Sequence, residues 1–509
     1  MAIFIPGLIS VAAGVVLALL RTRPSHERRL VKLLAGIAIW LLLTVFGPAD
    51  EAVQIPVWQV VSGHALSVRF DLNLWQWVWL QVFSSVYLIH LLHSAQDPAD
   101  DRQAVLRFVA LGIFLLAAAA ANDLARILLW LLLDILLALW RNVQRKDILP
   151  SLLLGIASVL LLMTGSVLSM LAGNAAGAEG VFSDGSRSLV ILVAALLRLM
   201  SGFAGKTKEN SLQETGTGNL LALLSGGLVV ALLVQEAPIA AVSRPWVLLF
   251  ACVGLLLQIE AFFRPNDASQ DVHPCYGQLL VLLCIGIAQP PETQTTILAA
   301  GASLWLILSA FDGFPPFRVP WWRWFVLLFP LVLAGLPYSP GGLFVAALLT
   351  VQQALIVLII GGMSLLLASA GAWRRWQHLR REEIKSLDGV IVLDYVAAVV
   401  WISAILYPVL RAGASFSPAS AIVFAILTMA SALILVLGDR MPAWDWTPQR
   451  VTPFVFRTRV LLGRLMGGVR TAYSYAVDLA SDILEGDGGT LWIIVVVLMA
   501  LLGLRNVSP

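Results

Sequence analysis

Charge is the scarcest property of this sequence. Only 12% of its 509 residues are charged, whereas 59% are hydrophobic. Soluble globular domains carry about 25% charged residues, so the composition excludes an ordinary soluble protein and predicts an all-α polytopic membrane protein. The net charge of +3 is too small over this length to indicate a nucleic-acid partner.

Cysteine is scarce too, and the motifs of cofactor chemistry are missing. Cys252, Cys275 and Cys284 form no Cys-x-x-Cys pair, so neither a disulfide framework nor a zinc site is indicated. His273 and Cys275 are a candidate metal pair, but a chance pairing in a loop is the favoured interpretation. The sequence has no Ser-His-Asp set, phosphate-binding Gly loop or haem-ligand pair. We therefore expect no catalytic residue, no metal and no cofactor.

Long apolar runs are what the sequence has in abundance. Sixteen of them approach the roughly 20 residues that a helix needs to cross a bilayer. The first lacks a basic stretch before it and a cleavage site after it, which favours a retained helix over a signal peptide. The predicted segments are 3–20, 30–46, 72–93, 104–121, 122–141, 149–173, 186–204, 218–235, 244–264, 275–289, 294–312, 321–338, 342–370, 391–411, 417–438 and 490–506.

Basic loops indicate the orientation. Arginine and lysine gather after the first, fifth and thirteenth segments, which places these three loops on one side of the membrane. Because cytoplasmic loops carry the excess of basic residues, we expect both termini on the outer side, in a bacterial inner or a thylakoid membrane. The residues concerned are Arg21, Arg23, Arg28, Arg29, Arg141, Arg145, Lys146, Arg374, Arg375, Arg380 and Arg381.

Two interruptions organise the middle of the chain. The stretch 198–218 contains four glycines, and a second Gly/Pro-rich stretch, 335–342, follows five segments later. Broken segments at matching places in two halves indicate inverted repeats around an ion or solute site. We predict two five-helix repeats, 104–235 and 244–371, in which the seventh and twelfth helices are broken.

The remaining regions flank these repeats. We expect three transmembrane helices in 1–103, the fourteenth and fifteenth helices in 372–447, and a final transmembrane helix in 490–509. Apolar residues recur at helical spacing in 448–489 with arginines between them, which predicts an amphipathic lateral helix in the cytoplasmic interface. A polar linker is the alternative for this stretch.

Two charges lie inside apolar runs. Asp134 has only leucine and isoleucine beside it, and Arg198 lies within the seventh segment. An isolated carboxylate there would be protonated or paired with a cation from another helix, and Arg198 is the candidate partner. Because arginine does not release its proton, this pair could hold charge or change geometry, but Arg198 could not itself relay protons.

Further candidates for ion translocation are less distinctive. Asp123 shares a helix face with Asp134, and Arg126 lies one turn after Asp123. For this pair a satisfied surface ion pair is the favoured alternative. Glu260 ends its segment, where snorkelling to the interface is favoured. Lys206, in the first interruption, and His273 complete the set.

A strand-like stretch leads to Asp71, Ala121-Asn-Asp-Leu124 opens the fifth segment, and Leu197–Ala204 carries Arg198 into the first interruption. With two later stretches, these resemble, in order, the antiporter-like subunits of respiratory complex I, Mrp-type cation/proton antiporters and membrane-bound hydrogenases, in which Leu197–Ala204 is similar to a lysine-bearing broken helix. Gln258-Ile-Glu, followed by Gln278 and Gly286, is a faint version of a further motif. The most specific match is 331–344, to the second broken helix.

The resemblance implies a proton- or sodium-translocating subunit of a larger membrane complex, coupled to a redox or other partner module. It implies partner subunits in the bilayer and, in a complex I-like assembly, a non-redox role within a translocase. This sequence differs from the family at the residues that relay protons. The family's glutamate aligns near Leu132, and Arg198 replaces its lysine. Two further charged positions of the family align near Ser225 and Ala346. A degenerate structural subunit and an unrelated multi-span transporter are the alternatives.

Overall fold

A computed structural model describes residues 4–46, 53–59, 65–94, 101–143, 149–174, 184–203, 217–235, 244–263, 272–312, 327–350, 355–381, 391–411 and 418–440. The chain divides into two units. The first, Met1–Ile55 with Val68–Asp439, holds nearly all the described residues, and the second comprises Pro56–Ser67 and Arg440–Pro509. The packing described below lies within the first unit.

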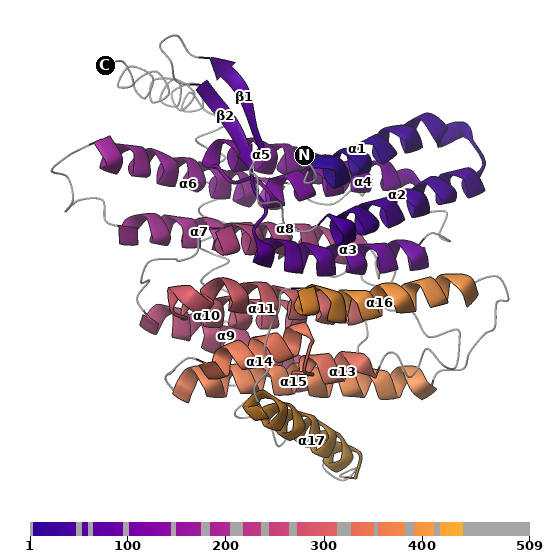
Figure 1. The fold of residues 1–509 in the computed structure, drawn as a ribbon, viewed down its shortest axis with the longest axis vertical. Helices are drawn as coiled ribbons and strands as arrows, with labels where there is room; N and C mark the ends of the chain where they lie inside the picture. The colour runs from indigo at the N-terminus through magenta and orange to yellow at the C-terminus, as the bar shows by residue number, and fades with distance from the viewer. Residues whose placement is uncertain are drawn as a thin grey trace. The chain divides into compact units, whose positions relative to one another are not determined.

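The described residues are almost entirely helical, with sixteen α-helices and one two-stranded sheet, β1 paired with β2. The elements, in the labels of Figure 1, are α1 (Phe4–Leu19), η1 (Leu20–Thr22), α2 (Ser25–Val45), β1 (Val53–Gln59), β2 (Ala65–Phe70), α3 (Leu74–Ser94), α4 (Asp101–Ala118), α5 (Asp123–Val143), α6 (Leu149–Asn174), α7 (Asp184–Phe203), α8 (Thr217–Gln235), α9 (Arg244–Phe263), α10 (Val272–Ile287), α11 (Pro291–Asp312), α13 (Leu328–Leu333), α14 (Pro340–Thr350), α15 (Leu355–Arg381), α16 (Ile391–Arg411) and α17 (Pro418–Arg440).

Helices that follow one another in the sequence pack side by side. From α4 to α8 each helix contacts the next, and α9, α10 and α11 form a second such series (Figure 1). Helix α3 links the two series, because it contacts α8, α11 and α16. The pair α5 and α7 both pack on α6, which brings residues far apart in the sequence to one place.

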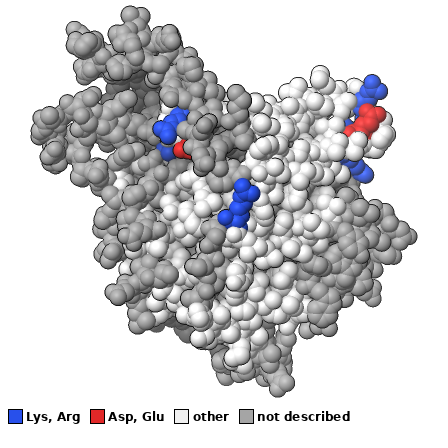
Figure 2. All heavy atoms as spheres, viewed as in Figure 1, with Lys and Arg blue, Asp and Glu red and all other residues white. Residues whose placement is uncertain are grey.

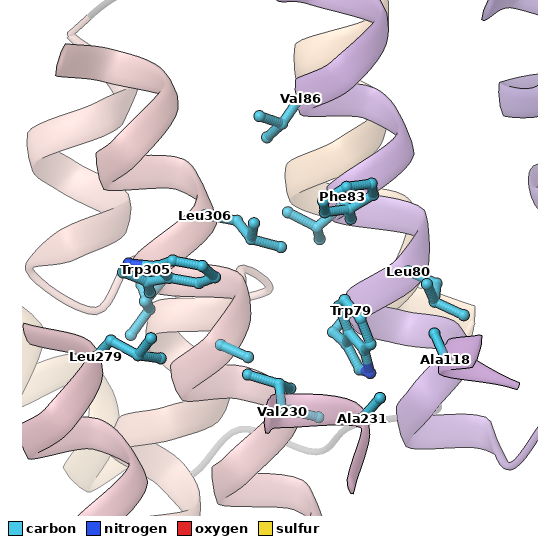
Figure 3. Close-up of a cluster of buried hydrophobic side chains, with 14 of the residues drawn as sticks. Trp79, Leu80, Phe83, Val86, Ala118, Val230, Ala231, Leu279, Trp305 and Leu306 are labelled. Carbon is cyan, nitrogen blue, oxygen red and sulfur yellow. The ribbon is translucent and has the colours of Figure 1, made fainter. Parts of the chain in front are cut away.

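Aromatic rings, among them Trp79, Phe83 and Trp305, lie at the junction of α3, α8 and α11 (Figure 3). A Cβ atom on Gly226 would lie 2.5 Å from the Trp305 ring, and one on Gly227 would lie 2.7 Å from the Phe114 ring. Helix α8 therefore approaches these rings only because two consecutive positions lack side chains. Such close packing holds membrane helices together, since lipid provides no hydrophobic driving force between them.

The sequence 335–342 contains a turn between two helices. Helix α13 ends at Leu333 and α14 begins at Pro340, with Gly335 at φ 95° and Tyr338 at φ 59°. Gly341 lies against the Val332 carbonyl, where a Cβ atom would clash. That α13 and α14 are one broken span within a repeat stays a prediction.

The predicted segment 342–370 differs in the structure. Two helices cover it, α14 ending at Thr350 and α15 beginning at Leu355. A continuous helix over this run would be about 43 Å long at 1.5 Å per residue, well beyond the roughly 30 Å of a bilayer core. The polar pair Gln352-Gln353 interrupts the run in the sequence.

The surface of the described region suits an apolar setting. Two helical stretches, Phe4–Thr22 and Ile356–Arg374, are long and apolar enough to cross a membrane by length and composition. Ten shorter apolar helices accompany them among the described residues. On the face in Figure 2, the described surface is mostly uncharged, with a few separate charged groups.

Several sequence predictions lie outside the described residues. These are most of the first interruption, 204–216, together with the lateral helix 448–489 and the final helix of 490–509. The repeat symmetry, the domain boundaries and the sidedness of the termini also stay predictions.

Candidate functional site: an ion pair buried between helices

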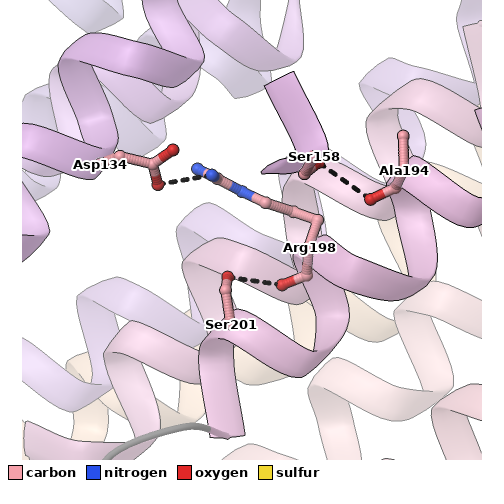
Figure 4. A network of polar contacts seen from close by, with 5 residues as sticks. All are labelled: Asp134, Ser158, Ala194, Arg198 and Ser201. Carbon is pink, nitrogen blue, oxygen red and sulfur yellow. Dashed lines mark hydrogen bonds and ion pairs between the residues drawn. The ribbon is translucent and has the colours of Figure 1, made fainter. Parts of the chain in front are cut away.

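Asp134 on α5 and Arg198 on α7 form an ion pair (Figure 4). The Arg198 Nη1 group donates to Asp134 Oδ1 over 2.5 Å. The Arg198 side chain is 0% exposed and that of Asp134 6%. The sequence placed both charges inside apolar runs, and the structure brings them together across 64 residues of sequence.

An aromatic ring from α5 lies beside the same guanidinium. The Arg198 Cζ atom is 5.0 Å from the centre of the Trp130 ring, and Trp130 is buried. Trp130 precedes Asp134 by four residues, so one helical face presents both groups to α7. A ring face attracts a cation, and more strongly where water is excluded. Arg198 is therefore held by a carboxylate and a π-system from one helix.

Helix α6 shapes the other side of the pair. A Cβ atom on Gly155 would lie 2.6 Å from Asp134 Oδ2 and 2.7 Å from Asp134 Cγ. Those separations are shorter than real Cβ atoms show. The absence of a side chain at Gly155 is thus what lets the Asp134 carboxylate lie against α6.

Serine hydroxyls brace the backbone of α7 around Arg198 (Figure 4). The Ser158 hydroxyl of α6 donates to the Ala194 carbonyl over 2.9 Å, and the Ser201 hydroxyl donates to the Arg198 carbonyl over 2.7 Å. The first of these bonds joins two helices one turn from Arg198. Together they fix the position from which the arginine reaches α5.

The Arg198 guanidinium has more N–H donors than it has acceptors among the described residues. A guanidinium carries five N–H donors, and Nε and Nη2 of Arg198 have no hydrogen-bond partner among the described residues. A buried charged donor without a partner is costly, so ordered water is the expected acceptor. The site can hold a fixed positive charge beside a carboxylate that is able to accept or release a proton.

The other predicted site residues are not brought to this pair by any described contact. Arg126 is buried, and its Nε donates to the Ala120 carbonyl over 3.2 Å, so its expected surface position is wrong. The accepting carbonyl belongs to the short connection between α4 and α5. Asp123 begins α5, Glu260 lies in α9 and His273 in α10, all with side chains outside the description. Lys206 lies outside the described residues altogether.

Two of the resembling stretches meet at the start of α5. The strand end at Phe70 bridges Ala120, the Asp71 N–H donates to the Ala119 carbonyl over 2.9 Å, and the Ala121 N–H donates to the Arg69 carbonyl over 2.8 Å. Residues just before α3 and just before α5 are therefore tied together, which anchors the N-terminal end of the helix that carries Asp134.

Sequence reasoning missed several parts of the site and its surroundings. Trp130 has a signal, because it lies one helical turn before Asp134. Gly155 has no such signal in the sequence, because a glycine in an apolar run does not indicate which side chain packs on it. Arg107 is a buried cation of α4 whose Cζ lies 5.5 Å from the Trp140 ring centre, and Lys32 of α2 is buried too. A search for charges within all apolar runs would have found both.

A metal site has no support in the described part of the chain, where no group of three or more His, Cys, Asp or Glu side chains could hold an ion. Comparison of sequences finds no match: no family model matches this chain, and no curated protein sequence matches it.

Solved structures do match the fold. A chain of respiratory complex I from Thermus thermophilus superposes with a TM-score of 0.59 at 16% identity, covering 84% of this chain and 99% of that chain. A chain of the membrane-bound sulfane sulfur reductase, an archaeal respiratory membrane complex, gives a TM-score of 0.59 at 13% identity, covering 99% of this chain and 100% of that chain. A chain of the Mrp complex from a Dietzia species gives 0.58 at 15% identity, covering 100% of this chain and 63% of that chain.

Identities this low establish a fold and leave the chemistry to be argued from residues. The chain has the fold of these membrane-complex subunits, and at that level the resemblance to antiporter-like subunits predicted from its motifs is confirmed.

Proposed function

We propose that this chain is a divergent antiporter-like subunit of a multi-subunit membrane complex that translocates protons or sodium ions. The buried Asp134–Arg198 ion pair carries the proposal, because removing two charges from water is expensive and apolar residues would pack there at less cost. An ion pair at such a site in this fold supports a role in moving or gating charge.

The chemistry divides unequally between the two side chains. Arg198 stays protonated, so it acts as a fixed charge, whereas Asp134 is the group that can exchange a proton. When Asp134 takes up a proton it loses its attraction for the guanidinium. Arg198 would then rest on the Trp130 ring and on water, and it would return when the carboxylate ionises again. This alternation is how the pair would couple proton binding to a change in geometry.

A structural subunit is the second candidate, and a specific observation favours it. Positions that align with charged residues of the family are uncharged here: Ser225 and Ala346 are both buried, and Leu132 is 44% exposed on a different face of α5 from Asp134. A proton relay needs titratable groups within reach of one another or joined by water. On this alternative the fold is kept for assembly, and the ion pair only fixes α5 against α7.

Ion flux through the intact complex decides between the two candidates. The variant Asp134→Leu/Arg198→Leu removes both charges while leaving no buried charge unpaired, so it should assemble. If the pair takes part in translocation, this double variant should lower proton or sodium flux in proteoliposomes at least tenfold, while the subunit composition of the complex stays unchanged. Wild-type flux from the assembled double variant would establish the structural alternative.

Co-purification tests the larger claim that the chain works within a complex. Gentle solubilisation followed by native mass measurement is expected to recover it with other membrane subunits. Recovery as a monomer with no co-purifying membrane protein, across several mild detergents, would contradict both candidates.

A further inference from the structure

Two glutamines on neighbouring helices are buried with all their polar side-chain atoms unsatisfied. Gln258 of α9 is 4% exposed and Gln278 of α10 is 0% exposed. The Oε1 and Nε2 atoms of both residues lack a hydrogen-bond partner among the described residues. Other buried glutamines differ: Gln76 accepts from the Asn73 N–H over 3.0 Å and donates to the Ala118 carbonyl over 3.4 Å.

The two glutamines belong to helices in direct contact. Helices α9 and α10 approach through a pair of glycines, since a Cβ atom on Gly254 would lie 2.8 Å from the Gly277 carbonyl oxygen, and one on Gly277 would lie 2.7 Å from the Gly254 carbonyl oxygen. Gln258 is one turn beyond Gly254, and its Cγ would be 3.1 Å from a Cβ on Gly277. Gln278 is the next residue of α10.

A third helix closes this region. Helix α15 packs on both α9 and α10, and the Arg374 guanidinium of α15 donates to the Phe262 carbonyl over 2.8 Å, one turn beyond Gln258. Gln258 and Gln278 therefore belong to two of three helices that pack on one another. Four unsatisfied polar atoms in such a place are an exception to the rule that buried polar groups find partners.

The chemistry of the four atoms selects the missing partner. Each amide presents one acceptor oxygen and two N–H donors, so a ligand must donate and accept at once. A cation could satisfy only the two oxygens and would face the N–H groups with the wrong sign. Water meets both requirements, and buried water typically makes about three hydrogen bonds to polar groups that lack partners.

We propose that Gln258 and Gln278 form a binding site for buried water at the contact of α9 and α10. This inference is independent of the proposed function, because it rests on the α9–α10–α15 contact and not on the Asp134–Arg198 pair. The site adds an uncharged, hydrated position to the second series of helices.

Water contact at the amides can be measured directly. In protein labelled with [15N]glutamine in lipid bilayers, solid-state NMR with transfer from water protons reports side-chain amides that touch water. We expect strong transfer to the Gln258 and Gln278 side chains and weak transfer to Gln76, which is equally buried but bonded to protein. The variants Gln258→Met and Gln278→Met assign the signals by removing one each.

A cryo-EM map that resolves ordered water provides a second measurement on the unaltered chain, should either variant fail to fold. Density within hydrogen-bond distance of an amide atom of each glutamine supports the proposal. Absence of water transfer, or a map showing the two amides bonded directly to each other with no water beside them, would overturn it.

Discussion

The carboxylate of Asp134 lies directly against the backbone of Gly155, on the helix that packs on both α5 and α7. This relationship explains how a charged pair fits among tightly packed apolar helices. The room for the carboxylate comes from a missing side chain on α6, so the geometry of the pair depends on a residue that makes no bond to it.

The change Gly155→Ala should disturb the pair without touching either charge. The new Cβ would need to lie 2.6 Å from Asp134 Oδ2, so the carboxylate must move and its bond to Arg198 must lengthen. We expect a loss of about 1–3 kcal/mol in the free energy of unfolding, as for overpacked cores. Thermal unfolding of the purified complex measures this.

Gly362→Ala on α15 is the matched control, because a Cβ atom there would meet nothing within 4 Å. Replacing this helical glycine should leave stability unchanged or raise it by up to about 1 kcal/mol. Equal effects of the two alanine variants would mean that Gly155 does not shape the site.

Removing one charge of the pair should cost more than removing both. Asp134→Asn leaves Arg198 buried without its counter-charge, which we expect to cost about 3–5 kcal/mol. The double change Asp134→Leu/Arg198→Leu removes both desolvation penalties and should recover much of that stability. Unfolding midpoints in one detergent compare the variants, and identical midpoints for the single and double variants would show that the two side chains are not coupled.

The sequence predicted the helical class and this pair for one physical reason. A bilayer penalises exposed charge and unsatisfied backbone, so long apolar runs mark helices and a charge inside a run demands a partner. Asp134 and Arg198 are both charged residues inside apolar runs, so each was expected to have a partner. Which helices meet was not available from periodicity, since it depends on small residues such as Gly155, Gly226 and Gly254, whose contacts lie far away in the sequence.

Two sequence interpretations failed for related reasons. Arg126 was placed at the surface because it lies near a helix end, yet it is buried and its Nε donates a hydrogen bond to the Ala120 carbonyl. The run 342–370 was read as one segment because apolar composition alone does not register a helix boundary. Gln258 and Gln278 were recognised only as parts of a faint motif, because an uncharged side chain in an apolar run does not by itself indicate a buried polar site.

Asn122→Ala should loosen the anchor of α5. The Asn122 Oδ1 atom accepts from the Ala125 N–H over 3.2 Å, as an N-cap does, and from the Arg69 N–H over 3.1 Å. Losing both bonds should cost about 1–2 kcal/mol. Asn122→Asp retains the acceptor and serves as the control. Hydrogen exchange of the α5 amides, faster in the alanine variant than in the aspartate variant, is the expected readout, and equal exchange rates would contradict the capping role.

Trp130→Phe tests whether the aromatic ring binds the charge of Arg198 or merely fills space. A smaller ring attracts a cation less strongly, so we expect a loss of about 1–2 kcal/mol from the weakened cation–π contact and the reduced packing. The two contributions separate when the same change is made in the Asp134→Leu/Arg198→Leu background, where no cation remains beside the ring. There the cost should shrink to the packing part alone, leaving a coupling energy of about 0.5–1 kcal/mol between Trp130 and the charged pair. Chemical unfolding of the four proteins under identical conditions gives that difference. If Trp130→Phe costs the same with and without the charges, the ring is only a packing residue and the proposed resting place for Arg198 is wrong.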